Sequence, residues 1–362
     1  MKKQTKILFA TAFGLLAVLG ASVYASGGSL QGRFTTAGSE LTIEVASTTP
    51  RADILISPSD HATAGLNAAS AYSFTTSGEA LLVEKLAVSL KGTTPYNPIT
   101  IEYEDSDGVT RADLAYVVEG IASFTGLDFY IPEADSKTLT IYADVLNIGT
   151  GATSGDVVKA VIAKSNFKAV GQDTGTTFTT LTFAATTEPN NMTIYQTKPT
   201  FSLDSSSPSG TRSVSAVDSM FVFNIHADDG GEVTVKDLRI NLTSSADFNT
   251  AAVVTATLED PDTGTVFAGP LQVRFSNAST AYIPFSDDFT VSASDDQLLE
   301  LVLDSATLLD EDSGVDDPVT AKINLGSSPV SGGGVVWNDG YNDVRWMGAL
   351  TSSTLTGNTV NY

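Results

Sequence analysis

The residues with the clearest capacity for chemistry are aspartates in short acidic stretches. Asp105 and Asp107 stand two positions apart, Asp260 and Asp262 repeat that spacing, and a glycine follows each pair. Carboxylates spaced in this way can share a hard cation such as Ca²⁺ with backbone carbonyl oxygens. Asp and Gly are also the usual residues of tight hairpin turns, and neither stretch completes the EF-hand pattern. Turn formation and calcium binding therefore both stay open.

A third acidic cluster covers residues 310–317 and has no counterpart in the first half of the chain. Its carboxylates are Asp310, Asp312, Asp316 and Asp317, together with a glutamate. Turn geometry alone does not require so many charges, so this cluster is the strongest of the three calcium candidates. Calcium is the only cofactor that the sequence brings forward.

The C-terminal segment contains both tryptophans of the chain. Trp337, Tyr341 and Trp346 lie close to Asn and Asp residues. Exposed aromatic rings near polar side chains could form a platform for a sugar. A hairpin whose indoles close one end of the hydrophobic core is the other interpretation, and the aromatic content of ordinary cores favours it.

Catalytic constellations are not evident in the sequence. The two histidines, His61 and His226, lack the spacing of a zinc site. No nucleophile elbow, phosphate-binding loop or dinucleotide fingerprint occurs at a strand-to-helix turn. We therefore expect a protein that is not an enzyme.

The N-terminus has the features of a secretory signal peptide over residues 1–25. Three lysines precede a short apolar stretch, and small residues stand before Ser26. A flexible leader is expected over residues 26–38. No second apolar stretch follows, so the mature chain is predicted to have no transmembrane segment. The expected location is extracellular, secreted or at the cell surface.

Charge and cysteine content narrow the partners further. The formal net charge is −23, which repels nucleic acid and anionic membranes. The chain has no cysteine. Such an exported protein depends on its hydrophobic cores, its turns or bound ions, because disulfides are excluded.

The sequence repeats itself after the leader. Residues 79–90 are echoed by residues 231–242, and in each copy the same series follows: an apolar strand, an acidic turn, an aromatic segment with proline, and an alternating strand. Duplication at this period predicts two modules, over residues 39–190 and 191–362. In both copies an extra residue interrupts the apolar alternation at the same place, which predicts equivalent β-bulges.

The pattern within each module is that of β-structure. Apolar residues alternate at period two, turn residues recur every 8–12 residues or so, and helical periodicity is almost absent. We predict an all-β protein of two tandem immunoglobulin-like antiparallel β-sandwiches. The first strand of the second module is expected over residues 194–203.

Four segments resemble repeat modules of bacterial secreted cell-surface and S-layer-like proteins. They cover residues 167–175, 192–200, 233–240 and 336–340. The resemblance implies immunoglobulin-like sandwiches, frequent dependence on calcium and, in many members, a wall-binding anchor. The partners that we expect are other copies of the chain or other surface components. No anchor repeat or sorting signal is evident.

These observations favour an exported structural protein of a surface layer, filament or coat, stabilised by calcium. An adhesin or carbohydrate-binding protein that recognises glycans through the C-terminal aromatic residues is the first alternative. A polysaccharide-active enzyme is the second.

Overall fold

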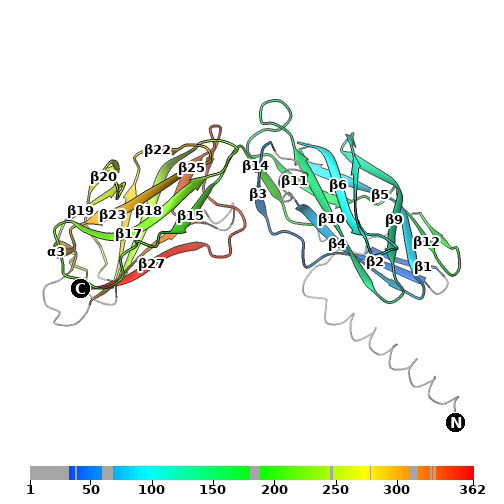
Figure 1. The fold of residues 1–362 in the computed structure, drawn as a ribbon, viewed down its shortest axis with the longest axis horizontal. Helices are drawn as coiled ribbons and strands as arrows, with labels where there is room; N and C mark the ends of the chain where they lie inside the picture. The colour runs from blue at the N-terminus through cyan, green and yellow to red at the C-terminus, as the bar shows by residue number, and fades with distance from the viewer. Residues whose placement is uncertain are drawn as a thin grey trace, which may run out of the picture. The chain divides into compact units, whose positions relative to one another are not determined.

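The computed structural model describes residues 32–36, 39–58, 68–93, 95–179, 188–244, 248–277, 279–309, 317–326, 328 and 332–362. Within these residues the chain consists of β-strands and one short helix, α3 (Ser305–Leu308), as Figure 1 shows. The predicted all-β class is confirmed. Residues 1–25, where the sequence predicts a signal peptide, lie outside the described residues.

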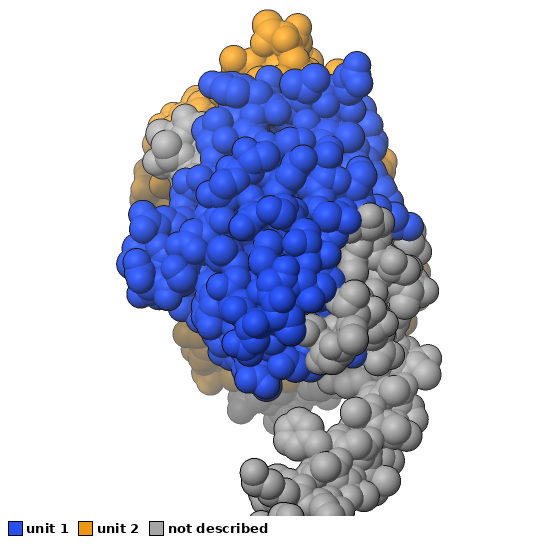
Figure 2. All heavy atoms as spheres, turned by 90° about the vertical axis from the view of Figure 1, so that its right-hand side faces the viewer, with its two compact units in different colours: residues 1–50, 64–144, 159–190 blue, residues 51–63, 145–158, 191–362 orange. Residues whose placement is uncertain are grey.

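The chain divides into two compact units, which Figure 2 shows in different colours. Unit 1 contains residues 1–50, 64–144 and 159–190, and unit 2 contains residues 51–63, 145–158 and 191–362. The last change of unit falls between residues 190 and 191, where the sequence predicts the module boundary. Two further segments of the first half, 51–63 and 145–158, group with the second half, which the sequence does not indicate.

Two sheets are formed by the first half of the chain. In the first sheet the strand order is β1 (Gly32–Thr36), β2 (Ser39–Val45), β4 (Ala68–Ser77), β10 (Ser136–Val145), β6 (Tyr96–Glu104), β7 (Thr110–Ala115). In the second it is β13 (Thr177–Phe178), β12 (Lys168–Gly171), β5 (Leu81–Gly92), β11 (Val157–Ile162), β14 (Met192–Tyr195), β3 (Asp53–Ile56). Strand β9 (Ile121–Ile131) also pairs with β5 and with the short β8 (Val117–Val118).

Two sheets likewise form the second half. The first has the order β15 (Pro199–Leu203), β17 (Asp218–Ala227), β23 (Asp296–Leu303), β19 (Val254–Glu259), β20 (Val266–Val273). The second has the order β16 (Gly210–Thr211), β27 (Thr354–Asn361), β24 (Pro318–Asn324), β18 (Val233–Ser244), β25 (Val335–Asn338), β26 (Asp343–Val344). Strands β21 (Thr280–Phe285) and β22 (Phe289–Val291) also pair with β18.

The two halves have the same strand order. The series β2-β4-β10-β6-β7 corresponds to β15-β17-β23-β19-β20, and β13-β12-β5-β11-β14-β3 corresponds to β26-β25-β18-β24-β27-β16. The last two strands of the second series are parallel in both copies, β14 with β3 and β27 with β16. The duplication in the sequence is therefore a duplication of topology.

The predicted β-bulges are present in the central strands of both repeats. The register of β5 against β9 and β12 shifts between Val83 and Lys85, and the register of β18 against β25 shifts between Val235 and Asp237. These are equivalent positions, and each shift turns the apolar side chains that follow back toward the core. Val83 and Leu86 are consequently both fully buried, although three positions separate them.

Two predicted segments differ from the structure. The single strand expected over residues 194–203 is wrong, because β14 and β15 are separate strands. Pro199, the first residue of β15, has no N–H, and the preceding Gln196 N–H donates to the carboxylate of Asp339 rather than to a sheet. By strand order β14 completes the first repeat. The expected leader, residues 26–38, also contains a strand, since Gly32–Thr36 forms β1 and pairs with β2; its other residues, 26–31 and 37–38, lie outside the described residues.

The hydrophobic core of each repeat lies between its two sheets. In the first repeat, Phe74 and Phe129 are fully buried and meet edge to face, with ring centroids 5.0 Å apart. In the second, Phe221 and Phe223 are fully buried, and their centroids are also 5.0 Å apart. Burial alternates along strands such as β23, where one face is apolar and the other more exposed, whereas all four residues of β14 are buried.

Candidate functional site

The acidic turn at Asp105 joins β6 to β7 and is closed by its own side chain. Asp105 Oδ1 accepts hydrogen bonds from the backbone N–H of Asp107 at 3.0 Å and of Val109 at 2.8 Å. The guanidinium of Arg111 donates to Asp105 Oδ2 at 2.6 Å. Hydrogen bonds, the strongest from Val109 and a further one from Arg111, hold the pKa of Asp105 below its ordinary value. The carboxylate therefore has a cation beside it already.

The turn at Asp260 joins β19 to β20 at the equivalent place. Asp260 Oδ1 accepts from the N–H of Asp262 at 2.8 Å and from the N–H of Thr263 at 3.0 Å. These two donors also lower the pKa of Asp260, with Thr263 contributing more. Gly264 has φ of 68°, a conformation that favours glycine and closes the hairpin. Both acidic turns thus have the hydrogen bonds of turn chemistry, and Asp107 and Asp262 are exposed.

Asp317 is the one residue of the third acidic cluster that lies within the described part of the chain. Asp310, Asp312 and Asp316 lie outside the described residues. Asp317 is buried, and its backbone exchanges hydrogen bonds with that of Tyr362, from Asp317 N to Tyr362 O at 3.0 Å and from Tyr362 N to Asp317 O at 3.2 Å. In the described part of the chain, no group of three or more His, Cys, Asp or Glu side chains is placed to hold a metal ion.

The two tryptophans belong to the core of the second repeat. Trp337 on β25 is fully buried, and its Nε1–H donates to the backbone oxygen of Trp346 at 3.1 Å. Trp346 is 2 % exposed, whereas Tyr341 in the intervening turn is 59 % exposed. The three rings therefore do not form an exposed platform. The burial of Trp337 and Trp346 supports the interpretation that the sequence favours, a hairpin whose indoles belong to the core, and speaks against the alternative of a sugar site over Trp337, Tyr341 and Trp346. Both indoles belong to the buried hydrophobic cluster of unit 2 instead, where Trp337 packs edge to face on Tyr195 of β14.

The corresponding hairpin of the first repeat, β12–β13, has its large side chain on the other strand. Trp337 pairs with Val344 across β25 and β26, whereas Ala169 pairs with Phe178 across β12 and β13. The large side chain has moved from one strand of the hairpin to the other. All four of these side chains are buried, so in both repeats this hairpin contributes one large aromatic ring to the buried residues.

A buried carboxylate, Asp339, lies in the turn that follows Trp337. Its Oδ1 accepts from the N–H of Tyr341 at 3.0 Å and of Asn342 at 2.8 Å. Its Oδ2 accepts from the Ser154 hydroxyl at 2.7 Å and from the Gln196 N–H at 2.9 Å. Asp339 therefore ties three separate segments of unit 2 together, and it is only 2 % exposed. Sequence reasoning missed this residue, because nothing in its own turn identifies the two distant donors.

Of the two histidines, His226 alone lies within the described residues. His61 lies outside the described residues. His226 Nδ1 is 3.1 Å from Asp296 Oδ1, an exposed cross-strand contact between β17 and β23.

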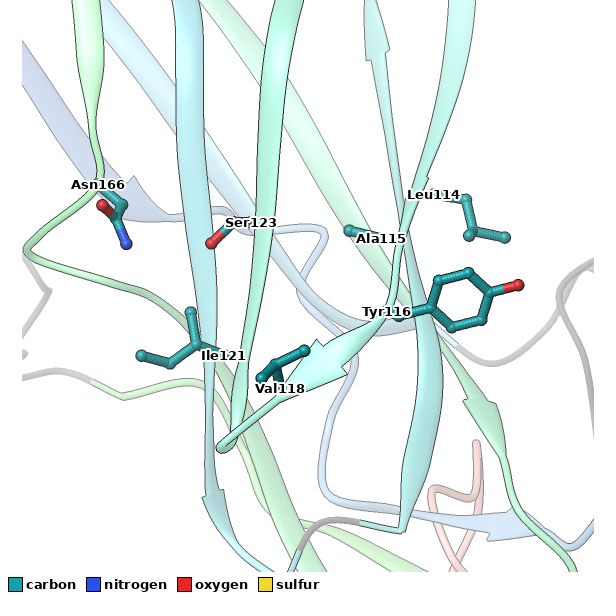
Figure 3. A pocket seen from close by; sticks show the side chains of 7 residues that line it. All are labelled: Leu114, Ala115, Tyr116, Val118, Ile121, Ser123 and Asn166. Atoms are coloured by element: carbon teal, nitrogen blue, oxygen red, sulfur yellow. The ribbon is translucent and has the colours of Figure 1, made fainter.

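An apolar surface at the end of β7 was also missed. Val109, Leu114, Tyr116 and Val118 are exposed by 49 %, 55 %, 68 % and 68 %. Leu114, Tyr116 and Val118, together with Ser123 on the neighbouring β9, line an open depression of about 390 Å³, shown in Figure 3. The signal in the sequence is that apolar residues stand on both faces of 109–118, which a half-buried strand does not need.

Comparisons with known proteins leave the family open. No family model matches the chain, and no curated protein matches it. Among solved structures, one of manganese lipoxygenase of Gaeumannomyces graminis with a partial zonadhesin of Komagataella pastoris aligns at 12% identity with a TM-score of 0.18, covering 90% of this chain and 93% of that one. The tandem CBM22 domains of Paenibacillus barcinonensis Xyn10C align at 11% identity with a TM-score of 0.16, covering 80% and 91%. The 7S globulin of Momordica charantia aligns at 9% identity with a TM-score of 0.13, covering 76% and 81%. Scores this low carry no argument about function.

No helix among the described residues has the length and apolar character needed to cross a membrane.

Proposed function

We propose that this chain is an exported, non-enzymatic structural protein of the cell surface, built from two tandem immunoglobulin-like β-sandwiches. It serves as a repeating body in a surface layer, filament or coat, and calcium stabilises it. Its partners are further copies of itself or other surface components.

The strand order supports the immunoglobulin-like assignment. When the shared strands are lettered in chain order, β2, β4, β5, β6, β10, β11 and β14 become A to G, and β15, β17, β18, β19, β23, β24 and β27 become A to G of the second repeat. The sheets then have the orders A-B-E-D and G-F-C in both repeats, which are the orders of a constant-type immunoglobulin domain. The additional strands are also shared: the one after D, those that pair with C, and the hairpin between F and G.

The observation that carries the function is this strand-for-strand repetition. Both copies contain the seven sandwich strands and most of the additional ones; among the described residues, β1 and β8 have no counterpart in the second repeat. Repetition of a complete body is typical of proteins that space, coat or connect, since each copy presents the same framework. The side chains that could have bound a ligand have structural roles instead. Asp105 and Asp260 close hairpins, and Trp337 and Trp346 are buried in the core.

Three parts of the proposal rest on sequence rather than on contacts. Export and an extracellular location come from residues 1–25. Calcium binding comes from the acidic cluster at residues 310–317 and from the resemblance to surface-layer modules. The carbohydrate-binding alternative has lost its principal support, because Tyr341 is the one member of its aromatic set with an exposed ring.

The test is assembly of the mature chain, residues 26–362. Electron microscopy and sedimentation at high protein concentration, with calcium and with EDTA, are expected to show ordered assemblies that calcium favours. A chain that stays strictly monomeric under both conditions contradicts the structural function. Glycan-array binding that Tyr341→Ala abolishes would favour the adhesin alternative.

A further inference from the structure

We infer that the free edge of strand β7 pairs with the β7 edge of a second copy of this chain, in an antiparallel arrangement with a two-fold axis at Ala112. This inference rests on the proposed structural function and names the surface through which copies meet.

β7 is an unprotected sheet edge. It is the last strand of its sheet, and it pairs with β6 over six consecutive residue pairs without a register shift. Its counterpart in the second repeat, β20, contains Pro270 and has two register irregularities against β19. At the opposite edge of that sheet, β15 begins with Pro199. Proline and bulges are devices that prevent an edge from pairing with another chain, and β7 has neither.

The backbone groups of β7 that face outward are identified by the hairpin. Asp105 N–H donates to Val109 O at 2.9 Å, so residues 105 and 109 form a hydrogen-bonded pair. Hydrogen-bonded pairs alternate along an antiparallel ladder, so residues 111, 113 and 115 also bond to β6. The N–H and C=O groups of Thr110, Ala112 and Leu114 therefore point away from the sheet.

A two-fold strand pair centred on Ala112 pairs all of these outward N–H and C=O groups. Ala112 faces Ala112 of the second copy, and Thr110 faces Leu114 in both directions. All three positions on each strand exchange hydrogen bonds. The small side chain of Ala112 lies at the axis, where two large side chains would meet.

Charges match in the same arrangement. Arg111 of one copy lies opposite Asp113 of the other, and the relation repeats across the axis. Such cross-strand pairs of opposite charge stabilise a sheet. Arg111 is 56 % exposed and has donors beyond the one used by Asp105, and the carboxylate of Asp113 accepts one hydrogen bond, from Tyr103 at 2.6 Å. A symmetric partner therefore suits this edge better than an unrelated strand.

Apolar side chains border the pairing. Leu114 is on the strand itself, and Tyr116 and Val118 follow it, all more than half exposed. Exposed apolar groups next to a regular free edge are typical of a surface on which a second strand docks. A six-residue edge buries less area than a standard stable interface, so this pairing alone gives a weak dimer that forms at high protein concentration.

Cysteine cross-linking tests the geometry directly, because the natural chain has no cysteine. In the two-fold pair, the Cα atoms at position 112 lie about 5.5 Å apart, within the range of a disulfide. The Cα atoms at position 114 lie about 14 Å apart, since they are offset by four residues along the strands as well as by the distance between the strands. On mild oxidation, Ala112→Cys is expected to form at least about tenfold more covalent dimer than the matched control Leu114→Cys. Equal cross-linking of the two variants overturns the inference.

Charge variants test the same axis without a covalent bond. Ala112→Glu and Ala112→Lys each place like charges opposite one another, so each variant alone is expected to lose dimer in sedimentation. An equimolar mixture places Glu opposite Lys and is expected to regain it. Val266→Glu, at an exposed position on the β20 edge, is the control that keeps wild-type association. Circular dichroism checks that every variant is folded.

The outcomes separate this inference from the proposed function. If Ala112→Glu assembles as the wild type does, the β7 interface is refuted and the structural function stands. If the wild type does not assemble, and Ala112→Cys forms no more covalent dimer than Leu114→Cys, both are refuted.

Discussion

Replacing Asp339 by alanine is expected to destabilise unit 2 strongly. The carboxylate accepts hydrogen bonds from Ser154 and Gln196, and also from Tyr341 and Asn342 in its own turn. Alanine removes all four acceptor contacts while leaving the donors in place. The donors of Ser154 and Gln196 come from segments distant in the sequence, and Ser154 is only 7 % exposed.

The magnitude follows from the surroundings of these donors. A hydrogen bond to a charged group contributes about 1.5–3 kcal/mol, and a buried donor without a partner costs about 1–3 kcal/mol. The two turn donors can be hydrated, so we assign the loss mainly to Ser154 and Gln196 and expect about 3 kcal/mol. For a body of about 150–250 residues this corresponds to a fall of roughly 6–12 °C in Tm.

The assay is thermal unfolding followed by tryptophan fluorescence. Both tryptophans of the chain lie in unit 2, so their emission reports on that unit alone. In Asp339→Asn the side-chain oxygen is expected to keep the turn hydrogen bonds, while the NH2 group faces the Gln196 N–H, donor against donor. The free energy of unfolding should therefore fall by about 2 kcal/mol. The exposed Asp262→Ala is the control and should change stability by no more than about 0.5 kcal/mol. A change of less than about 1 °C in Tm for Asp339→Ala would refute the reasoning.

Three further predictions concern the core, acid stability and calcium. Trp337→Ala should cost about 3–5 kcal/mol because it leaves a cavity, whereas Tyr341→Ala should stay within about 0.5 kcal/mol; urea denaturation compares the two, and equal losses would contradict the buried assignment. Hydrogen bonds from Lys91 and Lys159 lower the pKa of Glu188 from 4.5 to about 2, so its contribution to stability is present above pH 4.5 and is lost as the pH falls toward about 2. Glu188→Gln should flatten the Tm-versus-pH curve in that window, measured by circular dichroism, and an unchanged curve would contradict the ion pairs. EDTA should lower Tm if a bound ion stabilises the folded state, and an identical melting curve would remove calcium from the account.

Local patterns in the sequence were sufficient for the features that depend on neighbouring residues. Period-two alternation predicts strands because successive side chains of a strand point to opposite faces. The extra residue between Val83 and Leu86 predicts a bulge because one inserted residue must be accommodated in the ladder, and the bulge is found there. Asp followed by Gly predicts hairpin turns for a similar reason, and both acidic turns are hairpins with side-chain hydrogen bonds to their own backbone.

The roles of the aromatic and acidic side chains were not accessible in the same way. Trp337 in a polar, turn-rich segment is compatible with an exposed platform or with a core. Its burial depends on Tyr195, which lies more than a hundred residues earlier in the chain. Asp339 is similar, because Ser154 and Gln196 reach it from segments that only the fold brings together.

The sequence alone determined that the chain is a duplicated β protein, because duplication and alternation are properties of residue order. The tertiary structure decided which strands belong together: β14 completes the first repeat by pairing with β11 and β3, and β1 extends the first sheet. It also decided which strands lie at the sheet edges: β7, which has no proline, and β20 and β15, which each contain one. Strand pairing joins residues far apart in the chain, and its register depends on which faces are buried, so no local pattern specifies it.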